Sequence, residues 1–305
     1  ITKEFNRKYI LNNTTLIFIL FYLLILISSL LSNHLKFSLE SSLFYFRFYF
    51  FSLATLFILK KIPKSHMFFS ISLIFCLSIV SLDGIFEFIN GKNIIGSSAS
   101  GGRISGLFRD EWVIGSYLVR LLPLLVFCFL ITNIDNLFLK NIFYFTFSIS
   151  VITILISGER AAFINLCIYF FLMFICLVLK LKSKKFLFLI PIIITVFSLP
   201  FTNEKIKNRL LHSIDLHTSL DTSKNVYLKY YDNSFKMFKE KPILGHGPNT
   251  YRKKCAEFSL DNTSYGCNTH PHNNYFQLLS ETGFLGFCFI LFFFLFFIKE
   301  FLYLI

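Results

Sequence analysis

The feature that most constrains this chain is a series of apolar runs, each about 15 to 20 residues long, which is enough for a helix to cross a hydrocarbon core of roughly 30 Å. We count eight such runs in the 305 residues. They are Thr15–Leu31, Leu43–Leu59, Met67–Leu82, Val113–Ile131, Ile142–Ile156, Ala162–Leu179, Phe186–Phe201 and Phe284–Ile298. The sequence therefore predicts an all-α, polytopic membrane protein with about eight transmembrane helices.

The charge distribution agrees with a membrane protein and argues against a nucleic-acid partner. Only 15% of the residues are charged, where a soluble domain carries roughly 25%. The net charge of +13 comes mainly from short connections between apolar runs, which is the pattern expected of membrane topology. We therefore expect membrane lipids around the chain and no nucleic acid.

Basic residues gather in three connections that share one side of the membrane if the spans alternate. They are Lys3, Arg7 and Lys8 before the first span, Lys60, Lys61 and Lys64 after the second, and Lys180, Lys182, Lys184 and Lys185 after the sixth. Short loops rich in Lys and Arg stay in the cytoplasm. The connections 83–112, 157–160 and 202–283 are therefore predicted on the opposite face.

The topology divides the chain into three segments. Residues 1–201 form a seven-span region, residues 202–283 form a large outer loop, and residues 284–305 form the eighth span. The loop holds five of the seven histidines and contains Val226–Lys239, which has the pattern of an amphipathic surface helix. Because the chain begins with Ile1 rather than Met and stops within an apolar run, we expect it to be a piece of a longer protein.

Two cysteines, Cys255 and Cys267, lie in the large loop rather than in a span. On an oxidising outer face they suit a disulfide. Zinc is the competing interpretation, because His270 and His272 are near, but their spacing matches no standard zinc pattern. We therefore expect no metal here and keep the disulfide open.

Three polar clusters fall on the predicted outer face. Residues 101–111 carry Arg103 and Arg109, residues 157–163 carry Arg160, and residues 269–273 carry His270 and His272. Arginine grips phosphate oxygens in a bidentate manner, and histidine accepts a proton from a hydroxyl near neutral pH. Together these residue types suit a reaction on a diphosphate-linked substrate.

Each cluster also has a structural interpretation that the sequence leaves open. Arg103 and Arg109 are also explained as ordinary interfacial arginines or as partners of Asp110 and Glu111, and for a single arginine at a span end such a structural role is favoured. Arg160 has an adjacent structural partner in Glu159, although ionisable groups in so short a turn are costly and often functional. Arg120 lies about two helical turns inside its span and suits an internal polar cavity, whereas Arg47 suits snorkelling to the membrane surface. Loop histidines are usually inert, and Asn273 suits the cap of the following helix.

Four short motifs follow one another along the chain. They are Arg103-Ile-Ser-Gly-Leu-Phe108, Ser157-Gly-Glu-Arg160, Pro242-Ile-Leu-Gly-His-Gly247, and His272-Asn273 followed after nine residues by Gly283-Phe-Leu-Gly286. In these motifs and their order the chain resembles bacterial O-antigen ligases and the related O-antigen polymerases, whose pattern includes His-Asn-x9-Gly-x-x-Gly. The resemblance covers residues 83–286, with a large outer loop after the seventh span.

The resemblance implies an inverting, metal-independent glycosyltransferase of the bacterial inner membrane that uses no cofactor and faces the periplasm. Its donor would be a glycan on undecaprenyl diphosphate, and its acceptor a hydroxyl of lipid A-core, as in lipopolysaccharide biosynthesis. The family pattern makes His272 the base that activates the acceptor, and Arg103 and Arg160 the groups that hold the diphosphate. Further substrate contacts are expected from Arg109, Arg120, His246, Arg252, His270 and Asn273.

Other functions remain open at this point. A polymerase would use a second lipid-linked glycan as acceptor, and the sequence favours the ligase only slightly. A protein O-oligosaccharyltransferase shares the architecture. A polysaccharide transporter would also be polytopic and basic, but its ionisable residues should line a path through the midplane of the membrane, whereas most of those seen here cluster at one face.

Overall fold

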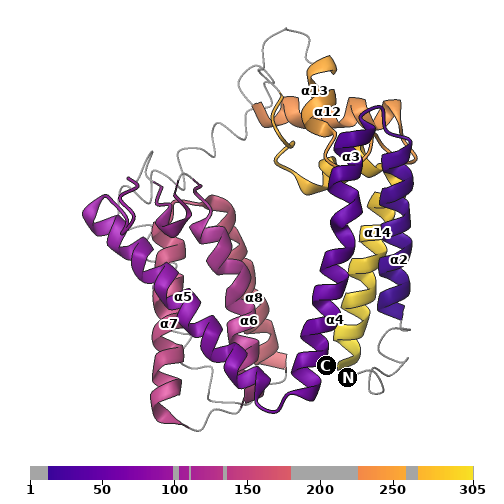
Figure 1. Ribbon diagram of the computed structural model, residues 1–305. Helices are drawn as coiled ribbons and strands as arrows, with labels where there is room; N and C mark the ends of the chain where they lie inside the picture. The colour runs from indigo at the N-terminus through magenta and orange to yellow at the C-terminus, as the bar shows by residue number, and fades with distance from the viewer. Residues whose placement is uncertain are drawn as a thin grey trace. The chain divides into compact units, whose positions relative to one another are not determined.

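The computed structural model describes residues 13–98, 103–109, 111–132, 136–179, 226–258 and 267–304. Their regular secondary structure is helical, and β-structure is limited to isolated bridges such as that between Lys92 and Ser98. The all-α prediction is therefore confirmed for this part of the chain (Figure 1). The predicted span Phe186–Phe201, much of the outer loop, and the N-terminal basic residues lie outside the described residues.

The chain divides into two compact units. Unit 1 comprises the described residues of Ile1–Lys60 and Leu216–Ile305, and unit 2 those of Lys61–Asp215. The helices of unit 1 are α2 (Asn13–Leu30), α3 (Leu35–Ser42), η1 (Leu43–Tyr45), α4 (Phe46–Lys61), α12 (Val226–Glu240), α13 (Tyr251–Phe258) and α14 (Asn274–Leu304). Those of unit 2 are α5 (Ser65–Asn90), η2 (Gly106–Phe108), α6 (Ile114–Thr132), α7 (Leu137–Ile156) and α8 (Arg160–Leu179).

Five stretches within the described residues are long and apolar enough to cross a membrane. They are Asn13–Leu30, Leu35–Lys61, Ser65–Asn90, Leu137–Ile156 and Asn274–Phe296. Ile114–Phe129 and Arg160–Met173 are shorter apolar helices. Every predicted span in the described part therefore coincides with an apolar helix, but α5 and α14 extend well beyond the apolar runs that predicted them.

Unit 2 is a helical bundle whose core combines large apolar side chains with small polar ones. Leu77, Leu118 and Phe147 are fully buried among α5, α6 and α7. Between α5 and α7, the Ser81 hydroxyl lies 3.0 Å from the Ser150 hydroxyl. Small hydroxyl side chains allow helices to approach closely and satisfy their own polar groups, which is a common way for membrane helices to associate.

Unit 1 brings the two ends of the described chain together. Helix α14 runs alongside α2, and α12 and α13 lie at one end of that pair (Figure 1). The Ser28 hydroxyl at the end of α2 donates to the Leu244 carbonyl at 2.6 Å. A group of buried serines continues this contact into α3, where the Ser38 hydroxyl donates to Ser29 at 2.9 Å. These contacts anchor the segment around Leu244 to α2.

Helix α14 is interrupted at Gly283, where φ is 65° and ψ is −166°. The break exposes backbone groups that residues 242–247 satisfy from both sides. The amide of Phe284 donates to the Pro242 carbonyl at 2.8 Å, and the amide of Gly247 donates to the Glu281 carbonyl at 2.8 Å. Unpaired backbone groups are costly away from water, so the inserted segment is what allows α14 to bend there.

Candidate functional site

His272 stands in a short strap, residues 267–273, that leads into α14. Its Nε2 lies 2.9 Å from Nδ2 of Asn268. The ring of His270 lies 4.3 Å away between centroids, and the rings of Tyr227 and Tyr230 on α12 lie at 5.7 and 5.5 Å. His272 is exposed, so its imidazole is held by neighbours while remaining open to a substrate.

The surroundings of His272 favour its neutral form. Burial against the neighbouring groups lowers the pKa of His272 below its ordinary value, and the positive charge that His270 can carry lowers it further. A histidine whose pKa lies below 6.5 is mostly unprotonated at neutral pH and can accept a proton. The site therefore presents a base rather than a cation.

The strap is fixed at both of its ends. At its start, Cys267 forms a disulfide with Cys255 of α13, which confirms the disulfide interpretation over zinc, because the bond occupies both sulfur atoms. At its end, Oδ1 of Asn273 accepts from the amide of Tyr275 at 2.9 Å. The predicted cap of the following helix is thus present. We found no group of three or more metal-ligating side chains among the described residues.

The glycines of the family patterns have a structural explanation in the break of α14. A Cβ added at Gly245 or Gly283 would overlap the backbone of the facing segment, and one added at Gly286 would overlap Thr282. Both Gly245 and Gly283 also have φ near +65°, a conformation that other residues rarely adopt. The nine residues between Asn273 and Gly283 therefore form the first turns of α14, from its N-terminal cap to its break.

Arg103 lies in unit 2 on a loop that two buried acids of α5 hold in place. The Glu87 carboxylate accepts from the backbone amides of Ser105 and Gly106 at 2.9 and 2.6 Å. Asp83 accepts from the amide of Ile94 at 2.9 Å. Both acids are completely buried. Charge-assisted bonds to backbone amides are strong, so this pair fixes the loop that presents Arg103.

The guanidinium of Arg103 is aligned by an aromatic ring. Its Cζ lies 5.6 Å from the ring centroid of Trp112, within the range of a cation–π contact. The Nε atom is buried and has no hydrogen-bond partner among the residues that the structure describes. A buried donor without a partner is uncommon, and it leaves Arg103 with unused capacity for an anionic oxygen.

Arg160 begins α8 directly after the turn that the sequence singled out. Glu159 does not depend on Arg160 for its partners, because its carboxylate accepts from the amides of Gly115 and Ser116 at 2.6 and 3.2 Å. These amides belong to the first turn of α6, where negative charge is favourable. Glu159 therefore has a structural role, while Arg160 is left half-buried at the end of unit 2 where α5 ends and α6 begins.

The remaining predicted residues differ in how they can serve a substrate. His246 is buried, and its Nε2 contacts the Met237 carbonyl at 3.0 Å; burial also lowers its pKa. This environment favours a packing role. Arg109, Arg120 and Arg252 are exposed. The position of Arg120 within its span predicted that it faces an internal polar cavity. This prediction is wrong for unit 2, because Arg120 lies on the surface of the unit rather than in its core.

Three residues that shape these clusters were not predicted from the sequence, namely Asp83, Glu87 and Asn268. Asp83 and Glu87 stand four residues apart at the end of an apolar run, which places them on one face of a helix. Two acids with that spacing in a membrane segment were a detectable signal. Asn268 carried no such signal, because only the folded strap brings it beside His272.

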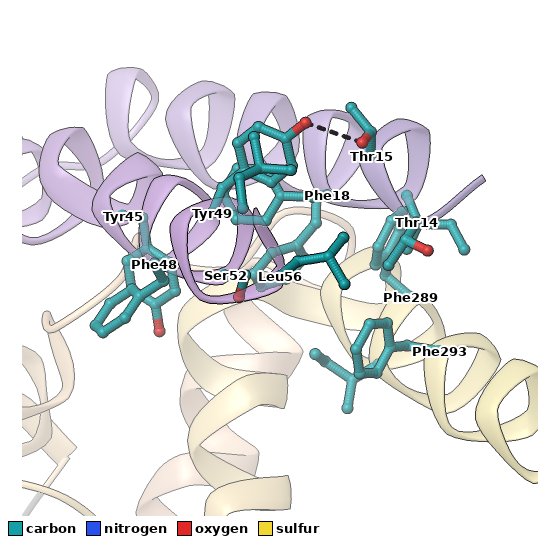
Figure 2. Close-up of a pocket in the computed structure, with 14 residues that line it drawn as sticks. Thr14, Thr15, Phe18, Tyr45, Phe48, Tyr49, Ser52, Leu56, Phe289 and Phe293 are labelled. Carbon is teal, nitrogen blue, oxygen red and sulfur yellow. Dashed lines mark hydrogen bonds between the residues drawn. The ribbon is translucent and has the colours of Figure 1, made fainter. Parts of the chain in front are cut away.

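An apolar cavity of about 630 Å³ lies within unit 1 among α2, α4 and α14. Figure 2 shows Phe18, Leu56 and Phe293 around it, with Thr15 bonded to the Tyr49 hydroxyl at its edge. A second cavity of about 260 Å³ shares Phe21 and Tyr45 with the first. Its other walls are more polar and come mainly from the start of α14, together with Ile25 and Pro248. The two cavities therefore form an apolar space that adjoins a polar one.

These observations describe a multi-helix membrane protein with a histidine-bearing strap at the end of an apolar helix. A family model described as O-antigen ligase matches residues 145–291. Residues 145–291 thus form an O-antigen ligase domain. This domain belongs to membrane enzymes of the ligase and polymerase type, which transfer glycans. The matched part includes Arg160 and His272 but not Arg103. Comparison with curated proteins and with solved structures gave no match.

Proposed function

We propose that this protein is an O-antigen ligase that moves a glycan from undecaprenyl diphosphate to a hydroxyl of lipid A-core. The observation that carries the proposal is the accessible imidazole of His272, whose pKa is lowered by its surroundings and which lies within the residues that match the O-antigen ligase family. A neutral histidine beside a membrane helix is suited to activate a hydroxyl.

In the proposed reaction, the acceptor oxygen attacks the anomeric carbon and forms the new glycosidic bond. The bond from that carbon to the diphosphate oxygen breaks, so the configuration inverts. His272 takes the hydroxyl proton, and the electron pair leaves with the lipid diphosphate. Arg103 and Arg160 hold the diphosphate and offset its growing charge, which is electrostatic stabilisation of a leaving group. The scheme needs neither a metal ion nor a cofactor.

Secondary contacts to the glycan or diphosphate are proposed for the exposed cationic groups. Arg109, Arg120 and Arg252 are available for this because their side chains are exposed. The ring of His270 lies beside the base in a tilted arrangement. Asn273 contributes through its cap of α14, and His246 through the packing of the loop beneath the strap. These last two would therefore act on the shape of the site rather than on the substrate.

The proposal includes eight spans in the bacterial inner membrane. The basic connections would face the cytoplasm, and residues 202–283 would face the periplasm. The apolar cavity among α2, α4 and α14 supports a lipid-linked substrate, because it is bounded by apolar side chains along membrane-crossing helices. Deletion of the gene, followed by analysis of the glycolipids, tests this function. Lipid-linked polymer that accumulates beside bare core supports the ligase.

Two other outcomes would contradict the ligase assignment. Single repeats attached to core, without longer polymer, would identify a polymerase that joins lipid-linked repeats. Unchanged glycolipids in the deletion strain would show that the protein does not have the proposed glycan-transfer activity. Re-expression of the full chain from a plasmid controls for effects on neighbouring genes, because it should restore the native glycolipid pattern.

A further inference from the structure

The basic nitrogen of His272 contacts a neutral side chain from its own strap. Nδ2 of Asn268 lies 2.9 Å from Nε2 of His272. We propose that Asn268 is a positioning residue that holds His272 as a neutral imidazole with the proton on Nδ1 and the lone pair on Nε2. The inference rests on the proposed function, since it concerns the base of that reaction.

The orientation of the Asn268 carboxamide follows from a second hydrogen bond. Oδ1 of Asn268 accepts from the backbone amide of Thr269 at 2.7 Å. A backbone N–H can only donate, so the atom beside it must be the oxygen. The NH₂ group is therefore the one that faces His272, and Nε2 must act as the acceptor.

This arrangement distinguishes between the two protonation states of the ring. A neutral imidazole offers a lone pair to the Asn268 donor. A protonated ring would place an N–H of its own against that donor, and the carboxamide could turn to relieve the conflict only by losing the bond to Thr269. Hydrogen bonding to the neutral form disfavours the charged one, so Asn268 keeps the base ready for a substrate proton.

The other groups around His272 add no negative charge that would reverse this effect. His270 comes from the same strap, and Tyr227 and Tyr230 come from α12. A histidine is neutral or positive, and tyrosines are neutral at the pH of the periplasm. The contacts that surround His272 in the described part of the chain thus all favour the neutral imidazole or are indifferent to its charge.

The disulfide places Asn268 where it can act. Cys267, the preceding residue, is bonded to Cys255 of α13, and the backbone of Asn268 is thereby held beside that helix. The acceptor hydroxyl would replace the Asn268 donor at the same lone pair and deliver its proton there. The Asn268 carboxamide would thus donate to Nε2 of His272 only until the substrate hydroxyl binds and donates there instead.

The test is the pH dependence of kcat/KM for glycan transfer by the full chain, compared between the native protein and Asn268→Asp. The aspartate would accept a hydrogen bond from a protonated His272 and raise its pKa. Opposite charges at this separation shift a pKa by about one to three units. The acidic limb of the profile should therefore move upward by about one unit or more. Asn268→Ala should move it in the same direction by less.

A purely structural role for Asn268 would lower the rate equally at every pH and leave the limb in place, and that result would overturn the inference. The matched control is Asn136→Asp, the same substitution at the exposed cap of α7 in unit 2, where an aspartate can accept the same backbone hydrogen bonds; its limb should coincide with the native one. If transfer is lost in His272→Ala but the acidic limb of the pH profile does not move in Asn268→Asp, this inference is rejected and the proposed function stands. Transfer that survives His272→Ala rejects the proposed function instead.

A second measurement keeps the test decisive if the aspartate variant is inactive. Diethyl pyrocarbonate reacts with a histidine only when its imidazole is neutral. The full-length protein is treated with the reagent at a series of pH values and then digested, and mass spectrometry of the peptides measures the modification of His272. The pH dependence of this modification reports the pKa of His272 directly. We expect the midpoint to rise by about one unit or more in Asn268→Asp. Equal midpoints in the two proteins would contradict the inference.

Discussion

His272 has a positive φ of 54°, which is uncommon for a residue with a side chain. Such strain persists only where surrounding contacts over-determine the conformation, and it clusters at functional sites. Here the contacts are the bond to Asn268 and the two tyrosine rings of α12. The observed conformation thus supports the view that the strap exists to present this imidazole.

The lowered pKa of His272 predicts the pH dependence of the native enzyme. The base form is present above the pKa and is lost as pH falls through it, so kcat/KM should be level near neutral pH and decline on the acidic side. The midpoint should lie below 6.5, the ordinary value for histidine. A midpoint above that value, measured for transfer in membrane vesicles, would mean that the surroundings of His272 favour its charged form.

At the scale of elements, the sequence predicted the positions of apolar helices well and their ends poorly. Hydropathy located α2, α4, α6, α7 and α8 because bilayer thickness sets a length that composition reveals. It placed the start of the last span at Phe284, whereas α14 begins at Asn274. The first turns of α14 are more polar, and their helical state depends on the Asn273 cap and on the inserted residues 242–247, which are tertiary features.

The break in α14 makes Gly283 a test of that insertion. Gly283→Ala should destabilise the protein because a φ of 65° with a ψ of −166° is a conformation essentially restricted to glycine, at a cost of about 1–3 kcal/mol in other residues. The added Cβ would also overlap the Ile243 carbonyl. Gly91→Ala is a matched control, because Gly91 has a φ of 75° but nothing within 4 Å of the added Cβ. Thermal unfolding in detergent should show the larger drop in Tm for Gly283→Ala. Equal drops would show that the insertion contributes nothing.

The disulfide predicts a dependence of activity on oxidation. Reducing the bond between Cys255 and Cys267, or replacing Cys267 by serine, should loosen the strap that carries Asn268 and lower the rate of transfer several-fold. Stability should fall by about 2–4 kcal/mol, a typical value for such a bond. Cys288→Ser removes a free cysteine and should change neither quantity. Full activity under reduction would show that the strap holds its position without the disulfide.

At the scale of the whole molecule, the sequence did not reveal which helices pack together. Hydropathy treats spans as a linear series, but α2 packs against α14, although they lie at opposite ends of the chain. Their contact includes the buried hydroxyl of Ser28, which donates to the Glu281 carbonyl of α14 at 3.2 Å. Composition alone does not distinguish such a serine from an ordinary polar residue. The Arg103 and His272 motifs were recognisable, whereas the acids and the amide that position them became visible only through the fold.

Membrane orientation can be tested on intact cells by cysteine labelling. Thr269→Cys in the strap should react with a membrane-impermeant maleimide, because the proposed topology puts residues 202–283 in the periplasm. Lys61→Cys, in a basic connection, should react only after the cells are opened. Both positions are exposed, so accessibility within the protein does not bias the comparison. The opposite pattern of labelling would invert the topology and place the site in the cytoplasm.

The central claim is that one of the two neighbouring histidines is the base of a glycan transfer. The most direct measurement compares His272→Ala with His270→Ala in vesicles that contain undecaprenyl-diphosphate-linked glycan and lipid A-core. Loss of a general base typically lowers a rate by about 10²–10⁴-fold, so we predict a loss in that range for His272→Ala and a much smaller one for His270→Ala, with both proteins inserted normally. Native transfer by the His272→Ala protein would contradict the account.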